Sequence, residues 1–152
     1  MNRGLTLLEL LVALVILVML GVLAIQPLAK FRTSEALDAA TTQTLSLINE
    51  ARQNTLASKN DTVYGVHFAE SQVVLFEGAV FSPSDPDNKE YNLDNSVHIS
   101  DISISGGSNV VFERLTGETS NIGHVTLSGT SQDVGERTIS INGTGLASED
   151  YD

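Results

Sequence analysis

One apolar stretch near the start of the chain decides the fold. It reads LTLLELLVALVILVMLGVLAI and occupies residues 5–25, a length similar to the ~20 residues that a helix needs to cross a hydrocarbon core. Glu9 is the only charged residue in this stretch. An ionisable group inside such a segment is disfavoured by roughly 2.5–3.5 kcal/mol on insertion scales and by default marks a functional position. We therefore expect Glu9 to have a partner outside its own helix: a lipid headgroup, another chain or a newly made amino terminus.

The residues around Glu9 form a distinctive pattern. Arg3 and Gly4 come first, Leu5 and Thr6 follow, and two leucines precede Glu9 and the rest of the apolar run. This pattern closely resembles the class III signal of type IV pilins and type II secretion pseudopilins. The resemblance implies that a prepilin peptidase cleaves the chain after Gly4 and methylates the new N-terminal residue, Leu5, where the family most often has Phe. It also implies that Glu9 is matched to the N-terminal amine of a neighbouring subunit during filament assembly.

Two other interpretations of the N-terminus explain less. A conventional secretory signal has a basic n-region, a short apolar core and a small-residue cleavage site. Here Arg3 is the only basic residue before the core, the core is too long, and residues 26–30 are a poor cleavage site. An uncleaved membrane anchor would account for the apolar run, but not for Glu9 or for Gly4 directly before the run.

The composition indicates one modest acidic domain behind this segment. The chain has 152 residues, no Cys, and 19 acidic against 8 basic residues, which gives a net charge of -11. The first 30 residues hold Arg3, Glu9 and Lys30 and sum to +1, so the rest of the chain carries -12. Because Arg3 precedes the apolar run, the positive-inside tendency places the N-terminus in the cytoplasm and the C-terminal domain outside the membrane. Lys30 and Arg32 beyond the run weaken this charge signal.

A single long helix is predicted from residue 5 to about residue 58. Pro27 removes one i to i-4 backbone hydrogen bond and should kink or loosen the helix where the apolar run ends. Beyond Pro27 the pattern becomes amphipathic, with spacings of mostly three or four residues that define one stripe for packing on a sheet. The stripe consists of Leu37, Ala40, Thr44, Leu47, Ile48, Ala51 and Thr55.

Short strand-like segments separated by turns fill the rest of the chain. Apolar and polar residues alternate most clearly over residues 97–104 and 137–142, which is the pattern of half-buried strands. The other expected strands are 63–68, 72–76, 91–93, 109–113 and 124–128, with residues 69–71 as a hairpin turn. Residues 148–152 are acidic and are expected to be a frayed end. One helix followed by six or seven strands is an α+β pattern, with an antiparallel sheet packed on the helix.

Several segments of this second half carry a further resemblance. They are Asn49-Glu50-Ala51-Arg52, the strand Val63–Phe68, and Ile139-Ser140-Ile141 with Gly143 and Gly145. In them the chain resembles the GspH/FimT group of minor pseudopilins and minor pilins. The resemblance implies a pilin-like fold in four parts. These are a leader peptide (1–4), a membrane-spanning or filament-core half of the helix (5–26), its amphipathic half (27–58) and an extracytoplasmic β-rich domain (59–152).

No catalytic site, cofactor or metal site is expected from the sequence. His67, His98 and His124 each lie inside a strand-like segment, without a second His or Cys at ligand spacing. One polar loop carries oxygen ligands of the kind calcium prefers, and some major pseudopilins have a calcium-stabilised loop, but its spacing does not match an EF-hand. The residues of this loop are Asp85, Asp87, Asn88, Glu90 and Asp94. Direct DNA binding is not expected, since the basic residues of the domain are isolated and the domain is acidic.

The sequence therefore predicts a structural, non-enzymatic subunit: a minor pilin or pseudopilin of a type IV pilus or a type II secretion-like filament. Its expected partners are other pilin or pseudopilin subunits, a prepilin peptidase, an inner-membrane assembly platform and, before assembly, membrane lipid. We expect it in the inner membrane as a single-pass protein and then in the filament. Two alternatives stay open: a major pilin, and a membrane-tethered binding domain that never polymerises, such as an accessory of DNA uptake.

Overall fold

The computed structural model describes residues 6–131 and 134–150, and for residues 22–29 it describes the backbone only. The leader 1–4 and the predicted cleavage bond between Gly4 and Leu5 lie outside the described residues. The chain divides into two compact units, residues 1–32 and residues 33–152.

The predicted long helix is confirmed as α1 (Leu7–Leu56). Pro27 lies inside this helix, and the kink that it should cause stays a prediction. In the first unit, every described side chain from Thr6 to Gly21 is exposed. Among the described residues, no helix contains a segment that is both long and apolar enough to span a membrane. The apolar run of residues 5–25 falls partly outside the described residues.

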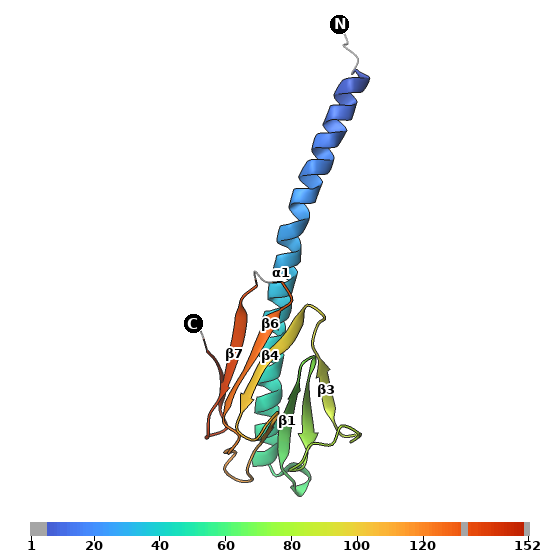
Figure 1. The fold of residues 1–152 in the computed structure, drawn as a ribbon. Coiled ribbons are helices and arrows are strands. Elements are labelled where there is room, and N and C mark those ends of the chain that lie inside the picture. The colour runs from blue at the N-terminus through green and yellow to red at the C-terminus, as the bar shows by residue number, and fades with distance from the viewer. Residues whose placement is uncertain (1–5, 132–133, 151–152) are drawn as a thin grey trace. The chain divides into compact units, whose positions relative to one another are not determined.

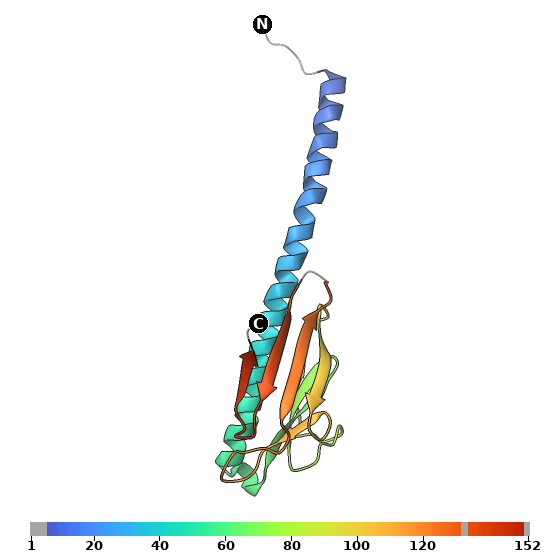
Figure 2. The ribbon, with the colours of Figure 1, turned by 60° about the vertical axis from the view of Figure 1, so that its left-hand side comes forward.

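The second unit contains two antiparallel sheets of four strands each. The first sheet, in the order β3-β2-β1-β5, consists of β1 (Tyr64–Ala69), β2 (Gln72–Glu77), β3 (Lys89–Asn92) and β5 (Asn109–Val111). The second sheet, in the order β4-β6-β7-β8, consists of β4 (Val97–Ile104), β6 (Gly123–Gly129), β7 (Glu136–Ile141) and β8 (Ala147–Asp150). A short 3-10 helix (Lys59–Asp61) leads from α1 to β1. Strands β4, β6 and β7 lie side by side along the second half of α1 (Figure 1), and β8 extends this sheet beyond β7 (Figure 2).

The core of the second unit forms between the amphipathic half of α1 and the inner faces of both sheets. All seven residues of the predicted helical stripe are buried, and Ile48, Ala51 and Thr55 have no exposed surface. They pack with inward-facing strand residues such as Val66 of β1 and Leu127 of β6. This packing explains why residues 33–56 have a fixed place in the fold.

Threonines can occupy the buried stripe because each hydroxyl finds an acceptor on the helix itself. Thr44 Oγ1 donates to the carbonyl of Ala40 at 2.8 Å, and Thr55 Oγ1 donates to that of Ala51 at 2.9 Å. Buried hydroxyls without such a partner would be strongly disfavoured. Thr55 Oγ1 also accepts the backbone N–H of Tyr64 at 2.9 Å, which ties the helix to the start of β1.

The strand predictions are confirmed for β1, β2, β4, β6 and β7. The predicted strand 109–113 is β5, which ends two residues earlier than expected, and the predicted short edge strand is β3, which begins two residues earlier. The expectation of a frayed end at residues 148–152 is wrong for residues 148–150, which belong to β8 and pair with β7. The acidic side chain of Glu149 on β8 lies 3.2 Å from Arg137 Nε on β7. This ion pair is not evident from the acidic sequence of residues 148–152 alone. Residues 151–152 lie outside the described residues.

Candidate functional site

The first turn of α1 places Glu9 in a helix cap. The backbone N–H of Glu9 donates to Thr6 Oγ1 at 3.2 Å, and the N–H of Leu10 donates to the carbonyl of Thr6 at 3.1 Å. Thr6 is therefore the N-cap, and Glu9 is the third residue of the helix. The sequence Thr6-Leu7-Leu8-Glu9 has the Ser/Thr-x-x-Glu spacing of a capping box, a signal that sequence analysis missed.

This position suits the carboxylate of Glu9 even before any partner arrives. The unsatisfied N–H groups of the first turn give a helix N-terminus a partial positive charge, which favours a nearby anion by typically 0.3–1 kcal/mol at exposed sites. The side chain of Glu9 is exposed, and it makes no ion pair with any described residue. The Thr6 cap thus fixes the position of Glu9 in the first turn of the helix. The carboxylate of Glu9 stays exposed and can bind a group from outside the chain.

Apolar side chains surround Glu9 on all sides of the helix, and the described residues of the first unit leave them exposed. Between Leu7 and Leu20 the large apolar side chains are 48–82% exposed. An apolar surface of this extent on one helix must be covered, because each Å² removed from water contributes about 25 cal/mol. The arrangement is an acid at the head of an apolar helix, suited to lipid or to other apolar helices. Gly4 and Leu5, which the cleavage prediction concerns, lie outside the described residues.

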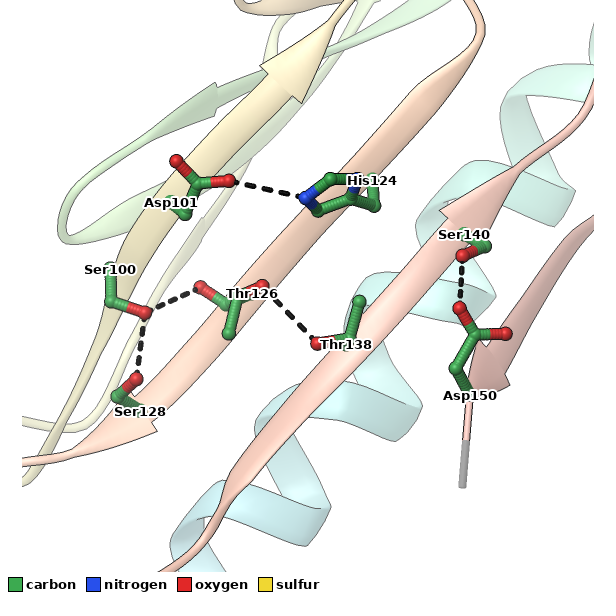
Figure 3. Close-up of polar contacts among 8 residues, drawn as sticks. All are labelled: Ser100, Asp101, His124, Thr126, Ser128, Thr138, Ser140 and Asp150. Atoms are coloured by element: carbon green, nitrogen blue, oxygen red, sulfur yellow. Dashed lines mark hydrogen bonds and ion pairs between the residues drawn. The ribbon is translucent and has the colours of Figure 1, made fainter. Parts of the chain in front are cut away.

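The three histidines do not converge on one another. His67 stacks on Phe81 with 4.0 Å between ring centroids, and its Nδ1 lies 2.7 Å from Asn109 Oδ1. His124 Nε2 lies 3.3 Å from Asp101 Oδ2 on the neighbouring strand (Figure 3). Among the described residues, no group of three or more His, Cys, Asp or Glu side chains is placed to hold a metal ion.

Figure 3 also shows a polar network on the face of the second sheet that is turned away from α1. Ser128 donates to Ser100 Oγ at 2.7 Å, and Ser100 donates to the carbonyl of Thr126 at 3.3 Å. Thr126 and Thr138 share a further hydroxyl contact at 3.2 Å. Each of these hydroxyls bonds to a neighbouring strand, so the network joins β4, β6 and β7 and offers no hydroxyl activated by a histidine.

The polar loop considered for calcium is organised by its own hydrogen bonds. Asp85 Oδ1 accepts the backbone N–H of Asp87 at 3.0 Å, and Asn88 Nδ2 donates to the carbonyl of Ser82 at 2.8 Å. Ser96 donates its hydroxyl at 2.6 Å and its backbone N–H at 2.9 Å to Asp94 Oδ1, and these bonds lower the pKa of Asp94. Asp85 and Asp94 therefore have local hydrogen-bond partners, whereas Asn88 Oδ1 is buried without one among the described residues. No described group of three or more acidic side chains is placed to hold a metal ion, so the calcium hypothesis gains no support here.

Residues that carried the C-terminal resemblance meet at the far end of α1. Arg52 Nε donates to the carbonyl of Gly117 at 3.0 Å, which binds the helix to the loop after β5. Gly145, in the turn between β7 and β8, has φ +75°, and a Cβ there would lie 2.0 Å from the same carbonyl oxygen. Arg52 and Gly145 thus hold two loops against the helix, which is a structural role.

Comparison with known proteins adds two findings and one absence. Residues 1–25 match the family described as the prokaryotic N-terminal methylation motif. Two crystal structures of the type IV minor pilin FimU of Pseudomonas aeruginosa (strain PAO1) are similar in fold. The structure in space group P21 has a TM-score of 0.60 and 11% identity over 80% of this chain and 92% of that chain. The structure in space group P65 has a TM-score of 0.56 and 11% identity over 76% and 93%. No curated protein matches the sequence. The chain therefore has a pilin-like α+β fold, with a prokaryotic N-terminal methylation motif at its head.

Proposed function

We propose that this chain is a minor pilin: a structural, non-enzymatic subunit that assembles into a pilus through its N-terminal helix. The observation that carries the proposal is the methylation motif of residues 1–25 at the head of a helix whose other half is built into a minor-pilin fold. The exposed apolar surface from Leu7 to Leu20 supplies what such a subunit needs for packing against others.

In the proposed mechanism the precursor is first a single-pass protein of the inner membrane, with its N-terminus in the cytoplasm and its β-rich unit outside. A prepilin peptidase cleaves after Gly4, which creates a free amine on Leu5 and leads to its methylation. The remaining partners are other pilin subunits and an inner-membrane assembly platform.

Glu9 then selects the register of the filament. As the helix enters an apolar filament core, its carboxylate loses the solvent or headgroups that had stabilised it. An amine from the N-terminus of a neighbouring subunit replaces them, because a buried charge is tolerated only with a well-placed counter-charge. The Thr6 cap supports this role, since the capping residue directly follows the proposed new N-terminal residue and the helix begins at Leu7.

The direct test is intact and N-terminal mass analysis of the protein purified from its own membranes. We expect a chain that begins at Leu5 and carries one added methyl group, while the variant Gly4→Leu should keep residues 1–4. A mature chain that begins at Met1, or at a conventional signal-peptidase site beyond residue 25, would contradict the proposal.

A further inference from the structure

Three consecutive residues at the end of the first unit, Lys30-Phe31-Arg32, make no ion pair and no ring contact with any residue that the structure describes. All three are exposed, and the Phe31 ring is 62% exposed. Neither Lys30 nor Arg32 makes an ion pair or a side-chain hydrogen bond with any described residue. We refer to these three residues as the Lys30–Arg32 collar.

The basic residues of the second unit behave differently, because each of them has a contact. Three of them pair with carboxylates: Lys89 with Glu50 at 2.6 Å, Arg114 with Asp61 at 2.5 Å, and Arg137 with Asp38 at 2.9 Å. The other two contact a carbonyl and a ring: Arg52 bonds to Gly117, and Lys59 lies 5.8 Å from the Tyr64 ring centroid. The described cations without partners are therefore concentrated in the collar.

The collar surrounds the helix and does not form a one-sided stripe. Successive helical residues are rotated by about 100°, so Lys30 and Arg32 point in directions about 160° apart, with Phe31 between them on one side. A neighbouring protein on one side of the helix directly faces only one of the two cations, and the other must reach around the helix. A membrane surface can, because it encloses the helix.

The position of the collar along the helix axis also fits a membrane surface. The apolar run ends at Ile25, and the five residues from there to Lys30 rise by about 7.5 Å along a helix. The headgroup layer on each side of a bilayer is roughly 5–7.5 Å thick beyond a hydrocarbon core of about 30 Å, which the apolar run matches in length. On the same count Arg32 lies about 10.5 Å beyond the run. Helical side chains lean toward the helix N-terminus, and those of Lys and Arg are long, so both charges can reach back into the layer where phosphates lie. The Phe31 ring leans the same way, toward the apolar boundary.

We propose that the Lys30–Arg32 collar binds the phosphate groups of anionic phospholipids and sets the depth of the helix in the membrane before assembly. This inference rests on the proposed membrane-anchored function. Acidic surfaces of other subunits are the competing partner, since residues 33–152 hold 18 acidic and 5 basic residues. The encircling geometry favours lipid over such a surface.

The test uses the full-length chain in vesicles, with Phe31→Trp as a depth probe. The natural sequence has no Trp, so this variant carries a single Trp, which lies inside the collar and can be excited selectively over the three tyrosines. Vesicles contain either phosphatidylcholine alone or phosphatidylcholine mixed with an equal amount of phosphatidylglycerol, with bromine atoms at shallow or deep positions of the acyl chains. We expect shallow bromines to quench Trp at position 31 best. Spin-labelled lipids should show a preference for phosphatidylglycerol of about fivefold per cation.

The decisive comparison is between two variants that remove equal charge. Adding Lys30→Gln and Arg32→Gln should abolish the preference for phosphatidylglycerol and shift quenching to deeper bromines. Adding Lys59→Gln and Lys89→Gln in the second unit should change neither. Unchanged lipid preference and depth in the collar variant would overturn the proposal. If that variant also assembled poorly, the collar would be a contact between subunits.

These outcomes are separate from those of the proposed function. The vesicle experiment does not depend on cleavage or methylation, so a failed lipid preference would leave the mass analysis of the N-terminus unaffected. A chain that is never cleaved after Gly4 could still show the headgroup contact.

Discussion

At the scale of single residues, Glu9 combines two physical roles that support each other. Its backbone N–H completes the cap made by Thr6, and its carboxylate lies at the positive end of the helix dipole. The same carboxylate is surrounded by exposed apolar side chains and has no ion-pair partner among the described residues. A charge that is locally stabilised yet unpaired is suited to recognise an amine from outside the chain.

The first prediction concerns this charge. Glu9→Leu should still insert into the membrane and be cleaved, because it removes a residue that insertion disfavours. It should assemble poorly, since the neighbour's amine would be buried without a counter-charge, a loss of roughly 3–5 kcal/mol. The measurement is the fraction of the subunit recovered in sheared filaments, with Leu8→Ile as the control. Normal incorporation of Glu9→Leu would refute the pairing mechanism.

A second residue-scale prediction concerns Gly145. Gly145→Ala places a Cβ in the left-handed region and 2.0 Å from the Gly117 carbonyl oxygen. The left-handed conformation alone costs about 1–2 kcal/mol, and the clash adds to it. We expect the thermal midpoint of the second unit to fall by more than about 4 °C. Gly143→Ala, in the same turn and with its nearest neighbours at 3.9 Å, is the matched control and should change the midpoint little. Equal midpoints for the two variants would contradict this account.

At the scale of elements, the second half of α1 is held by both sheets through different kinds of contact. The buried stripe supplies the apolar packing, and Thr55 ties the helix to β1 through the Tyr64 N–H. Arg137 on β7 links three elements, because it contacts Asp38 of α1 at 2.9 Å and Glu149 of β8 at 3.2 Å. This shared cation adds an ion pair to the backbone pairing of the acidic edge strand β8 with β7.

The element-scale prediction follows from that link. Arg137→Gln should lower the free energy of unfolding of the second unit by about 1 kcal/mol, the upper end for partly exposed ion pairs, because two carboxylates lose one cation. Hydrogen exchange should increase most in β8. Lys89→Gln, which removes the single more exposed pair with Glu50, is the control and should have a smaller effect in urea unfolding. A larger loss in the Lys89 variant would show that β8 does not depend on Arg137.

At the scale of the whole molecule, the two units differ in net charge and in how far their apolar side chains are buried. Residues 1–32 carry three basic residues and one acid, a net charge of +2, whereas residues 33–152 carry -13. Every residue of the buried apolar cluster belongs to the second unit, while the described side chains from Thr6 to Gly21 are all exposed. The second unit thus has its own core, and the first has apolar surface for other molecules to cover.

The whole-molecule prediction is that residues 33–152 fold alone. A chain that begins at Thr33 retains the complete buried cluster and a large negative charge that opposes association. We expect a soluble monomer with one cooperative unfolding transition by circular dichroism. The variant Leu37→Asp, which places a charge at a position only 1% exposed, should abolish that transition. Aggregation of the unsubstituted fragment would show that the core needs the first unit.

The long helix, its buried stripe and most strands could be predicted from the sequence alone, because they depend on local periodicity. Leu37, Ile48 and Thr55 follow a helical repeat, and Val97 to Ile104 follow a strand repeat, whatever they pack against. The prepilin motif is equally local, since Arg3, Gly4 and Glu9 are recognised as a linear pattern. The Thr6 cap was available in the same way and was overlooked.

Other features were decided by tertiary structure. Residues 148–150 form a strand by pairing with β7, whose Arg137 also contacts Glu149, and the acidic sequence of this segment does not indicate that pairing. The division of the strands into two sheets, and the meeting of Arg52 with Gly117 and Gly145, arise only when distant segments pack on one helix. The sequence by itself determined the helix, its motif and the alternation of its strands, because those are set by neighbours along the chain. The order of the strands in the two sheets and the long-range ion pairs depend on the tertiary structure. Their stabilising energy comes from residues that lie far apart in the sequence and meet only when the chain folds.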